Sequence, residues 1–401
     1  MAAGKKTVWN KDFICAALAN MLLCLGHFAT HPFIASYSKL LGAGVGLTGF
    51  LTGMFYGVAL AMRPVSGPMI TRLDKRKLMI GVFGLGAAAN LGYALFPTVP
   101  LFIAFRFLNG AQYSFVGSLI LTRIGDSLPP DKMASGMGIY GVSGSIGMSV
   151  APAAGGWLRD FGAARFGELE GYRLLFLYAM AVMLAAIIPC AVASPDAPAK
   201  DGAVLRDKWY KNIFTADALP VATIMMFLIM AYSLYSAYIV EFAKERGISG
   251  ASVFFTVQAA VLIVFRPVMG AVSDKYGTRV ALPSMALFAA SFLIVGAARD
   301  LPTLLIASVV SAAGYGAAQP MVQAMSMRVV PRERRGIASN TLYIGMDLGF
   351  FLGPVIGAWT ALRAGGYGPM FFFAALPAAL AIAAFVFALP GYKRLSEKYG
   401  G

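Results

Sequence analysis

The stretch Arg63-Pro64-Val65-Ser66-Gly67 returns 203 positions later as Arg266-Pro267-Val268-Met269-Gly270, and each copy ends a long apolar segment. The recurrence indicates that the chain is a duplicated unit. It also places an arginine inside each of two segments that are long enough to cross a membrane. A charged side chain at depth in a bilayer is energetically expensive and usually functional. We therefore expect a duplicated membrane transporter, and the two arginines favour an anionic solute.

The composition supports a membrane protein. Apolar residues make up 59% of the 401 residues and charged residues 13%, whereas soluble domains contain roughly 25% charged residues. The three cysteines (Cys15, Cys24 and Cys190) lie in apolar segments at no metal-ligand spacing, so we predict packing residues and neither a disulfide nor a metal site. Basic loops at one membrane surface explain the net charge of +15 better than nucleic-acid binding does.

Twelve apolar segments are long enough to span a bilayer, which takes about 20 residues. They are expected at about 13–35, 47–70, 78–97, 100–122, 134–158, 173–194, 217–240, 251–272, 280–298, 302–327, 336–361 and 367–390. The polar stretch 195–212 separates an N-terminal six-helix bundle at 1–194 from a C-terminal one at 213–401. The prediction is an all-α membrane protein with 12 transmembrane helices in two pseudo-symmetric six-helix bundles.

The basic residues predict the orientation of these helices. With both termini in the cytoplasm, 22 of the 33 Lys and Arg residues fall in cytoplasmic segments and 8 in external ones. The remaining three, Arg63, Arg106 and Arg266, lie inside helices. We therefore expect a multi-pass protein of the cell or inner membrane with cytoplasmic termini, acting as a monomer.

One loop motif resembles that of a known family. The loop after the eighth segment, Gly270-Ala271-Val272-Ser273-Asp274-Lys275-Tyr276-Gly277-Thr278-Arg279, is similar to the loop motif of the major facilitator superfamily without a gap. The loop after the second segment departs from it, since Thr71 replaces the aspartate and Asp74 the second glycine. In that family the loop helps to lock the cytoplasmic gate. The resemblance therefore implies gating roles for Gly67, Asp74, Arg76, Gly270, Asp274, Gly277 and Arg279.

Two further motifs extend the resemblance over nearly the whole chain. Leu101 to Gly110 resembles the helix-4 motif of proton-coupled members, in which the arginine, here Arg106, is implicated in coupling. The fifth segment resembles the helix-5 motif of drug:proton antiporters, although its first Gly-Pro is Ala151-Pro152, and a related pattern recurs in the eleventh. The motif residues are Gly147, Pro152, Gly155, Gly156, Gly349 and Pro354. The resemblance implies two halves with a site between them near the bilayer midplane.

The substrate-binding candidates centre on the two duplicated arginines. Each lies eight residues before its loop, about 12 Å into the hydrocarbon at 1.5 Å per residue, so snorkelling to the surface is a strained explanation. The Arg-Pro of the eighth segment also resembles carboxylate-transporting members, in which this arginine engages the carboxylate, and a guanidinium fork binds carboxylates bidentately. Arg266 is thus the predicted main anion contact. Arg63 is the second arginine candidate. The remaining candidates, which hydrogen bonding between helices explains nearly as well, are Tyr232, Tyr235, Gln319, Gln323 and Gln112.

Asp347, Arg106, His27 and His31 are candidates for proton coupling. Asp347 lies near the middle of the eleventh segment, where a carboxylate needs a proton or a cationic partner; a packing hydrogen bond is the alternative. His27 and His31 are the only histidines, and at i, i+4 they share one helix face and titrate near neutrality. That spacing can also bind a metal, but no acidic residue completes a zinc-protease motif. The alternative role of Arg106 is an interfacial anchor.

These patterns predict a proton-coupled secondary transporter that works by alternating access, with an exporter-type antiporter of a small organic solute favoured. The alternative is an organic-anion or carboxylate symporter or an anion exchanger. An enzyme is disfavoured because no catalytic cluster appears at one depth, and a channel because the gating-loop plan is duplicated. No nucleotide-binding loop of the Gly-x-x-x-x-Gly-Lys-Ser/Thr type appears, so ATP drive is not expected. The expected partners are a small-molecule substrate, protons and the lipid bilayer, with no cofactor.

Overall fold

Long helices dominate the computed structural model, which describes residues 7–195, 212–250 and 253–399. Twelve of them have at least 17 residues. They are α1 (Lys11–Thr30), α3 (Val45–Arg72), α4 (Lys75–Leu95), α5 (Val99–Ser127), α6 (Met133–Phe166), α7 (Glu168–Val192), α9 (Leu219–Glu245), α10 (Val253–Tyr276), α11 (Ala281–Ala297), α12 (Leu301–Arg328), α13 (Arg335–Ala364) and α14 (Tyr367–Tyr399). The prediction of an all-α protein with twelve long helices is confirmed. Apart from its ends, the predicted linker 195–212 lies outside the described residues.

Eight stretches of the described residues are helical, long and apolar enough to cross a membrane, and one of them, Val253–Ala297, contains both α10 and α11. The observed helices mostly run past the predicted spans: α6, for example, continues to Phe166 where the prediction ends at 158. The first predicted span, 13–35, is interrupted. Pro32 lies in a short 3-10 helix, His31–Phe33, between α1 and α2 (Ile34–Leu40). Proline is tolerated in the first turn of a helix, where its missing N–H is not needed.

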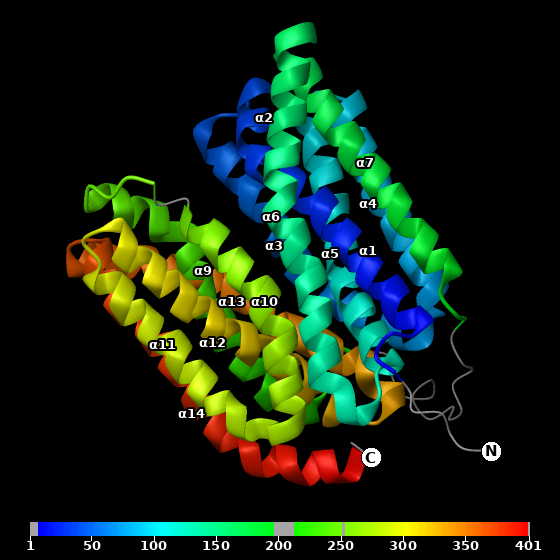
Figure 1. Cartoon of the computed structure of the whole chain (residues 1–401). Coiled ribbons are helices and arrows are strands. Elements are labelled where there is room, and N and C mark those ends of the chain that lie inside the picture. The colour runs from blue at the N-terminus through cyan, green and yellow to red at the C-terminus, as the bar shows by residue number, and fades with distance from the viewer. Residues whose placement is uncertain (1–6, 196–211, 251–252, 400–401) are drawn as a thin grey trace. The chain divides into compact units, whose positions relative to one another are not determined.

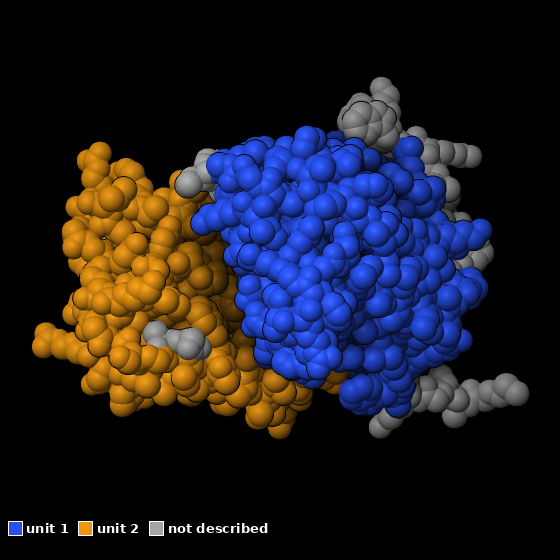
Figure 2. Space-filling view, turned by 90° about the horizontal axis from the view of Figure 1, so that it is seen from above, with its two compact units in different colours: residues 1–127, 143–213 blue, residues 128–142, 214–401 orange. Residues whose placement is uncertain are grey.

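The chain divides into two compact units, which Figure 2 colours separately. Unit 1 comprises Met1–Ser127 and Ser143–Ile213, and unit 2 comprises Leu128–Val142 and Phe214–Gly401. The helix α6 thus contributes to both units. Its N-terminal part lies in the predicted N-terminal bundle but packs with unit 2, through the contacts described in the next subsection.

In unit 1, α1, α4, α5 and α7 lie side by side, and α3 packs on α5 (Figure 1). The core between them includes the fully buried rings of Tyr37, Tyr93, Phe102 and Phe176. Tyr37 donates its hydroxyl hydrogen to the carbonyl of Tyr93 at 2.7 Å. The buried hydroxyl therefore has a hydrogen-bond partner inside the apolar core.

In unit 2, α9 packs on α13 and α14, and α12 packs on α10 and α11. Glycines allow the first of these contacts: a Cβ added to Gly349 of α13 would lie 2.6 Å from the carbonyl oxygen of Met226 in α9. Asp300 caps α12 by accepting from the backbone N–H of Thr303 at 2.8 Å. Hydrogen bonds from Thr303 hold the pKa of this exposed carboxyl below its usual value. The last part of α14 runs at an angle to its first part (Figure 1), and Pro390 lies in this helix.

The glycine contact between α13 and α9 gives the first prediction. Gly349→Ala should lower stability by about 1–3 kcal/mol because the added methyl group overpacks the contact with Met226. Gly84→Ala in α4 is the matched control, since a Cβ there meets nothing within 4 Å, and it should raise stability by about 0.5–1 kcal/mol. Thermal unfolding of both variants in detergent measures the difference, and equal melting temperatures would contradict the packing account.

Candidate functional site

Arg266 of α10 lies in a polar cluster of unit 2. Its side chain is mostly buried, with the residue 8% exposed. One terminal nitrogen, Nη2, donates to Oε1 of Gln319 in α12 at 2.6 Å, and Nη1 donates to the carbonyl of Gly141 in α6. A Cβ at Gly141 would lie 2.9 Å from Nη1, so a side chain at this position of α6 would make the guanidinium shift.

Two stacked tyrosines extend this cluster. The rings of Tyr232 in α9 and Tyr315 in α12 have centroids 4.3 Å apart and planes 12° apart. Both lie within electrostatic reach of Arg266, and Gln319 follows Tyr315 by one helical turn. We call Arg266, Gln319, Tyr232 and Tyr315 the Arg266 cluster. Tyr315 is not among the candidates predicted from the sequence, although its i, i+4 spacing to Gln319 places the two on one helix face.

The other substrate-binding candidates lie in packed surroundings. Tyr235 is 1% exposed, with its hydroxyl 2.6 Å from Oγ of Ser291 and its ring stacked on Phe292. Gln112 packs against Gly86 of α4, and Gln323 is buried in α12. Their substrate-binding roles stay predictions.

Arg63 differs from Arg266 in its surroundings. It is 1% exposed, and its Nη1 donates to the carbonyl of Ser114 at 2.6 Å and to Oγ of Ser118 at 2.7 Å. Both acceptors belong to α5. The second and fourth long helices of unit 1 are therefore joined by Arg63 in the same way as α10 and α12 are joined by Arg266 in unit 2.

Asp347 lies on a polar stripe of α13. Asn340, Tyr343 and Asp347 follow one another at three and four residues, which places them on one helix face, and all three are buried. Among the described residues, Asp347 is the one buried carboxylate, at 3% exposure. Gly345 and Gly349 lie on the opposite side, where they contact α9.

Asp274, at the end of α10, caps the N-terminus of α6. Its Oδ1 accepts from the backbone N–H of Ala134 at 2.9 Å, and its Oδ2 accepts from that of Ser135 at 2.8 Å and from the Ser135 hydroxyl. Arg328 reinforces the corner by donating to the carbonyl of Pro130 at 2.7 Å. A carboxylate at a helix N-terminus satisfies unpaired N–H groups and complements the helix dipole. These bonds explain why the start of α6 belongs to unit 2.

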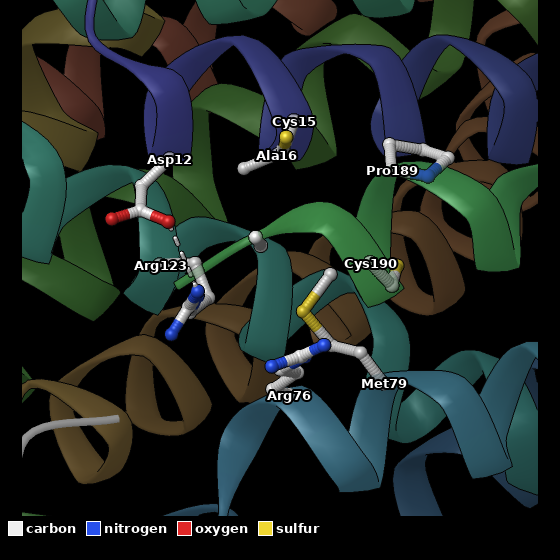
Figure 3. Close-up of a pocket in the computed structure, with 9 residues that line it drawn as sticks. Asp12, Cys15, Ala16, Arg76, Met79, Arg123, Pro189 and Cys190 are labelled. Carbon is white, nitrogen blue, oxygen red and sulfur yellow. Dashed lines mark hydrogen bonds and ion pairs between the residues drawn. The ribbon is translucent and has the colours of Figure 1, made fainter. Parts of the chain in front are cut away.

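The corresponding loop of unit 1 is built differently. Asp74 caps the helix that follows it, accepting from the N–H of Lys77 at 2.8 Å. Arg76 and Arg123 line a small pocket at the end of α7 (Figure 3), where they donate to the carbonyls of Ala191 and Ser194. Asp12 completes the arrangement 3.4 Å from Arg123. Cations here satisfy the last carbonyls of α7 and its dipole.

The histidines and Arg106 come together in unit 1. The rings of His27 and His31 have centroids 5.4 Å apart. Arg106 is 2% exposed; its Nε donates to the carbonyl of Leu51 at 3.0 Å, and its guanidinium carbon lies 5.0 Å from the centre of the Phe55 ring. Such burial does not fit the interfacial anchor that the sequence left open as an alternative.

Comparison with known proteins identifies the family. The model of the Major Facilitator Superfamily matches residues 16–278 and 221–400. The chain belongs to this superfamily. It is thus a multi-pass membrane protein and a secondary transporter of small molecules, not an enzyme.

Individual relatives are distant. The staphylopine export protein of Staphylococcus aureus is 22% identical over 362 residues, which cover 83% of this chain and 86% of that protein. Multidrug resistance protein 2 of Bacillus subtilis is 23% identical over 180 residues, covering 45% of this chain and 43% of that protein. The crystal structure of the fucose:proton symporter of E. coli matches with a TM-score of 0.75 at 15% identity, covering 94% of this chain and 98% of that one, and shows the shared fold.

The helix-5 and helix-11 motif residues of this superfamily member lie at helix contacts. A Cβ at Gly147 of α6 would meet Cβ of Cys24 in α1, and one at Gly155 would meet the carbonyl of Ala29. Gly349 and Gly353 of α13 make the same kind of approach to α9. In each unit, therefore, the motif brings the fifth or eleventh helix close to the first or seventh, as small residues do in membrane bundles.

The cap on α6 gives the second prediction. Asp274→Ala should lower stability by about 1–3 kcal/mol, since two backbone N–H groups lose a charged acceptor. Asp131→Ala is the control, because Asp131 carries the same charge on the same corner but is exposed. Thermal unfolding in detergent compares the two variants, and a loss of similar size in both would rule out a specific cap.

Proposed function

We propose that this superfamily member is a proton-coupled, exporter-type antiporter of a small organic anion. It would lie in the cell or inner membrane with both termini in the cytoplasm, as the basic residues predict. The substrate contact would be Arg266, and the proton carrier would be Asp347.

The charge buried in the protein carries the anion proposal. Among the described residues, the buried charged side chains inside helices and away from their ends are three arginines, Arg63, Arg106 and Arg266, and one carboxylate, Asp347. The buried Arg123 pairs with Asp12, and the buried Arg335 begins α13. Cations inside a membrane protein are retained where they serve a function, and an excess of one sign raises the local concentration of ligands of the opposite sign. The interior is therefore suited to an anion.

Arg266 is the arginine best placed to exchange partners. Arg63 is held by two α5 acceptors at 2.6 and 2.7 Å, whereas Arg266 donates to a side-chain amide and to one carbonyl of α6. A carboxylate binds a guanidinium fork more strongly than neutral oxygens do. An anion that displaced the Gly141 carbonyl would therefore loosen the start of α6, which would link binding to a conformational change.

The direction of transport and the coupling ion are inferred from the names of two relatives and from Asp347. Two of the relatives described above are named for export and for multidrug resistance, which favours efflux. Asp347, as the one buried carboxylate described, is the residue best suited to bind and release a proton during each cycle.

The alternative function is an organic-anion symporter or an anion exchanger, which the same arginines would serve. Transport into proteoliposomes with an imposed pH gradient distinguishes an antiporter, a symporter and an exchanger. An antiporter accumulates the anion on the acidic side and a symporter on the alkaline side, while an exchanger ignores the gradient and requires a second anion.

The two duplicated arginines give the third prediction. Arg266→Lys should weaken binding of a transported anion about tenfold, because lysine lacks the bidentate fork. Arg63→Lys should change the Kd by less than about twofold and lower the melting temperature instead. Titrations followed by thermal shift provide the Kd values, and an unchanged Kd in Arg266→Lys would contradict the assignment.

The fourth prediction concerns Asp347. Asp347→Asn should abolish the pH dependence of uptake into proteoliposomes while anion exchange at equal pH continues, since an amide cannot carry the proton. Glu241→Gln is the control, because Glu241 is exposed and pairs with Lys244, and its pH profile should match that of the parent. A parental slope in Asp347→Asn would remove Asp347 as the proton carrier.

A further inference from the structure

Unit 1 contains a cluster of aromatic and imidazole rings where α1, α3 and α5 meet. His27 stacks on Phe55, with centroids 4.6 Å and planes 25° apart, and on Tyr113, at 5.4 Å and 24°. His31 and Tyr56 extend the cluster, with centroids 6.0 Å apart. We call His27, His31, Phe55, Tyr56 and Tyr113 the imidazole cluster.

Both imidazoles carry an unsatisfied polar atom. The Nε2 atoms of His27 and His31 are buried and have no hydrogen-bond partner among the described residues. His27 as a whole is only 7% exposed. A buried polar atom without a partner loses its hydration, and no hydrogen bond offsets the free-energy cost. Native proteins keep such atoms mainly where a ligand, a water or a function accounts for them.

The charge beside the cluster selects the type of ligand. The Arg106 guanidinium lies over Phe55 and within electrostatic reach of both histidines. No Asp or Glu of unit 1 is buried among the described residues. A metal cation would meet a positive charge here, and the described residues contain no group of three or more potential metal ligands. An anion would instead gain from Arg106.

The residues of the cluster differ in exposure. His27 and Phe55 are buried, whereas His31, Tyr56 and Tyr113 are partly exposed. Aromatic rings prefer other rings in offset-stacked or edge-to-face contact. A planar ring is therefore the shape that the exposed side chains recognise best.

We propose that the imidazole cluster and Arg106 bind an aromatic carboxylate. Its ring would contact Tyr56 and Tyr113, and its carboxylate would accept hydrogen bonds from the Nε2–H groups of the histidines near Arg106. A neutral imidazole can carry its proton on Nε2 and therefore act as this donor. This inference rests on the proposed transport of an organic anion and specifies the class of that anion. The imidazole cluster would be a contact within unit 1, separate from the contact at Arg266 of unit 2.

Two probes of equal charge test the ring preference. Benzoate and cyclohexanecarboxylate are titrated into the purified parent protein, and the thermal shift gives each Kd. The parent should bind benzoate about fivefold more tightly. Tyr113→Leu should reduce this ratio to about one, while Tyr113→Phe keeps it. Tyr178→Leu is the control, because Tyr178 is a partly buried tyrosine of unit 1 that packs outside the cluster.

A second pair of variants tests the imidazoles. His27→Leu should weaken benzoate binding about tenfold without lowering the melting temperature of the ligand-free protein, because it removes an unsatisfied nitrogen. His27→Gln, which keeps a hydrogen-bond donor, should restore part of the affinity. If His27 were a packing residue alone, the leucine variant would melt earlier and bind benzoate normally.

The outcomes separate this inference from the proposed function. Equal binding of both carboxylates, with loss of both in Arg266→Lys, would overturn the aromatic site and leave the anion transporter standing. Binding of neither would contradict both. Stabilisation of the parent by Zn²⁺ alone, lost in His31→Leu, would make the cluster a metal site and the inference wrong.

Discussion

A guanidinium group inside a membrane protein depends on hydrogen-bond acceptors that the protein itself supplies, and this constraint organises both units. In hydrocarbon no water replaces a missing hydrogen bond. Arg63 of α3 reaches α5, where it donates to a carbonyl and a hydroxyl. Arg266 of α10 reaches α12, where it donates to a side-chain amide. Arg106 binds a carbonyl and an aromatic face.

The duplication preserves this plan and then varies it. The Arg63 bonds lie wholly within unit 1, while Arg266 also reaches the N-terminal part of α6 through Gly141. The loops differ in the same sense: Asp74 caps its own following helix, whereas Asp274 caps α6. The second Arg-Pro copy and its loop therefore bind the start of α6, which belongs to the first half of the sequence. In the proposed function, a ligand at Arg266 would compete with this contact to α6.

The sequence predicted the architecture well because length and apolar composition are properties of each segment by itself. The twelve helices, the glycine motifs and the buried arginines all follow from local patterns. It did less well where packing between helices decides. No sequence pattern distinguishes Tyr315 from the other tyrosines, because its partner Tyr232 lies on another helix, α9. For Arg106 the sequence left an interfacial anchor open as the alternative to proton coupling, because sequence position gives depth but not the neighbouring helix. The interruption of the first predicted helix at Pro32 was missed as well, and the proline alone does not predict it, because Pro64 and Pro152 lie inside continuous helices.

The central claim is that the positive interior, with Arg266 as its contact, serves an organic anion. The most direct measurement compares benzoate with benzylammonium, which share a ring and a similar size but carry opposite charges, by thermal shift of the purified protein. The account predicts that benzoate raises the melting temperature in the parent, with a much smaller shift in Arg266→Lys, and that benzylammonium has no effect in either. Stabilisation by benzylammonium and not by benzoate would contradict it.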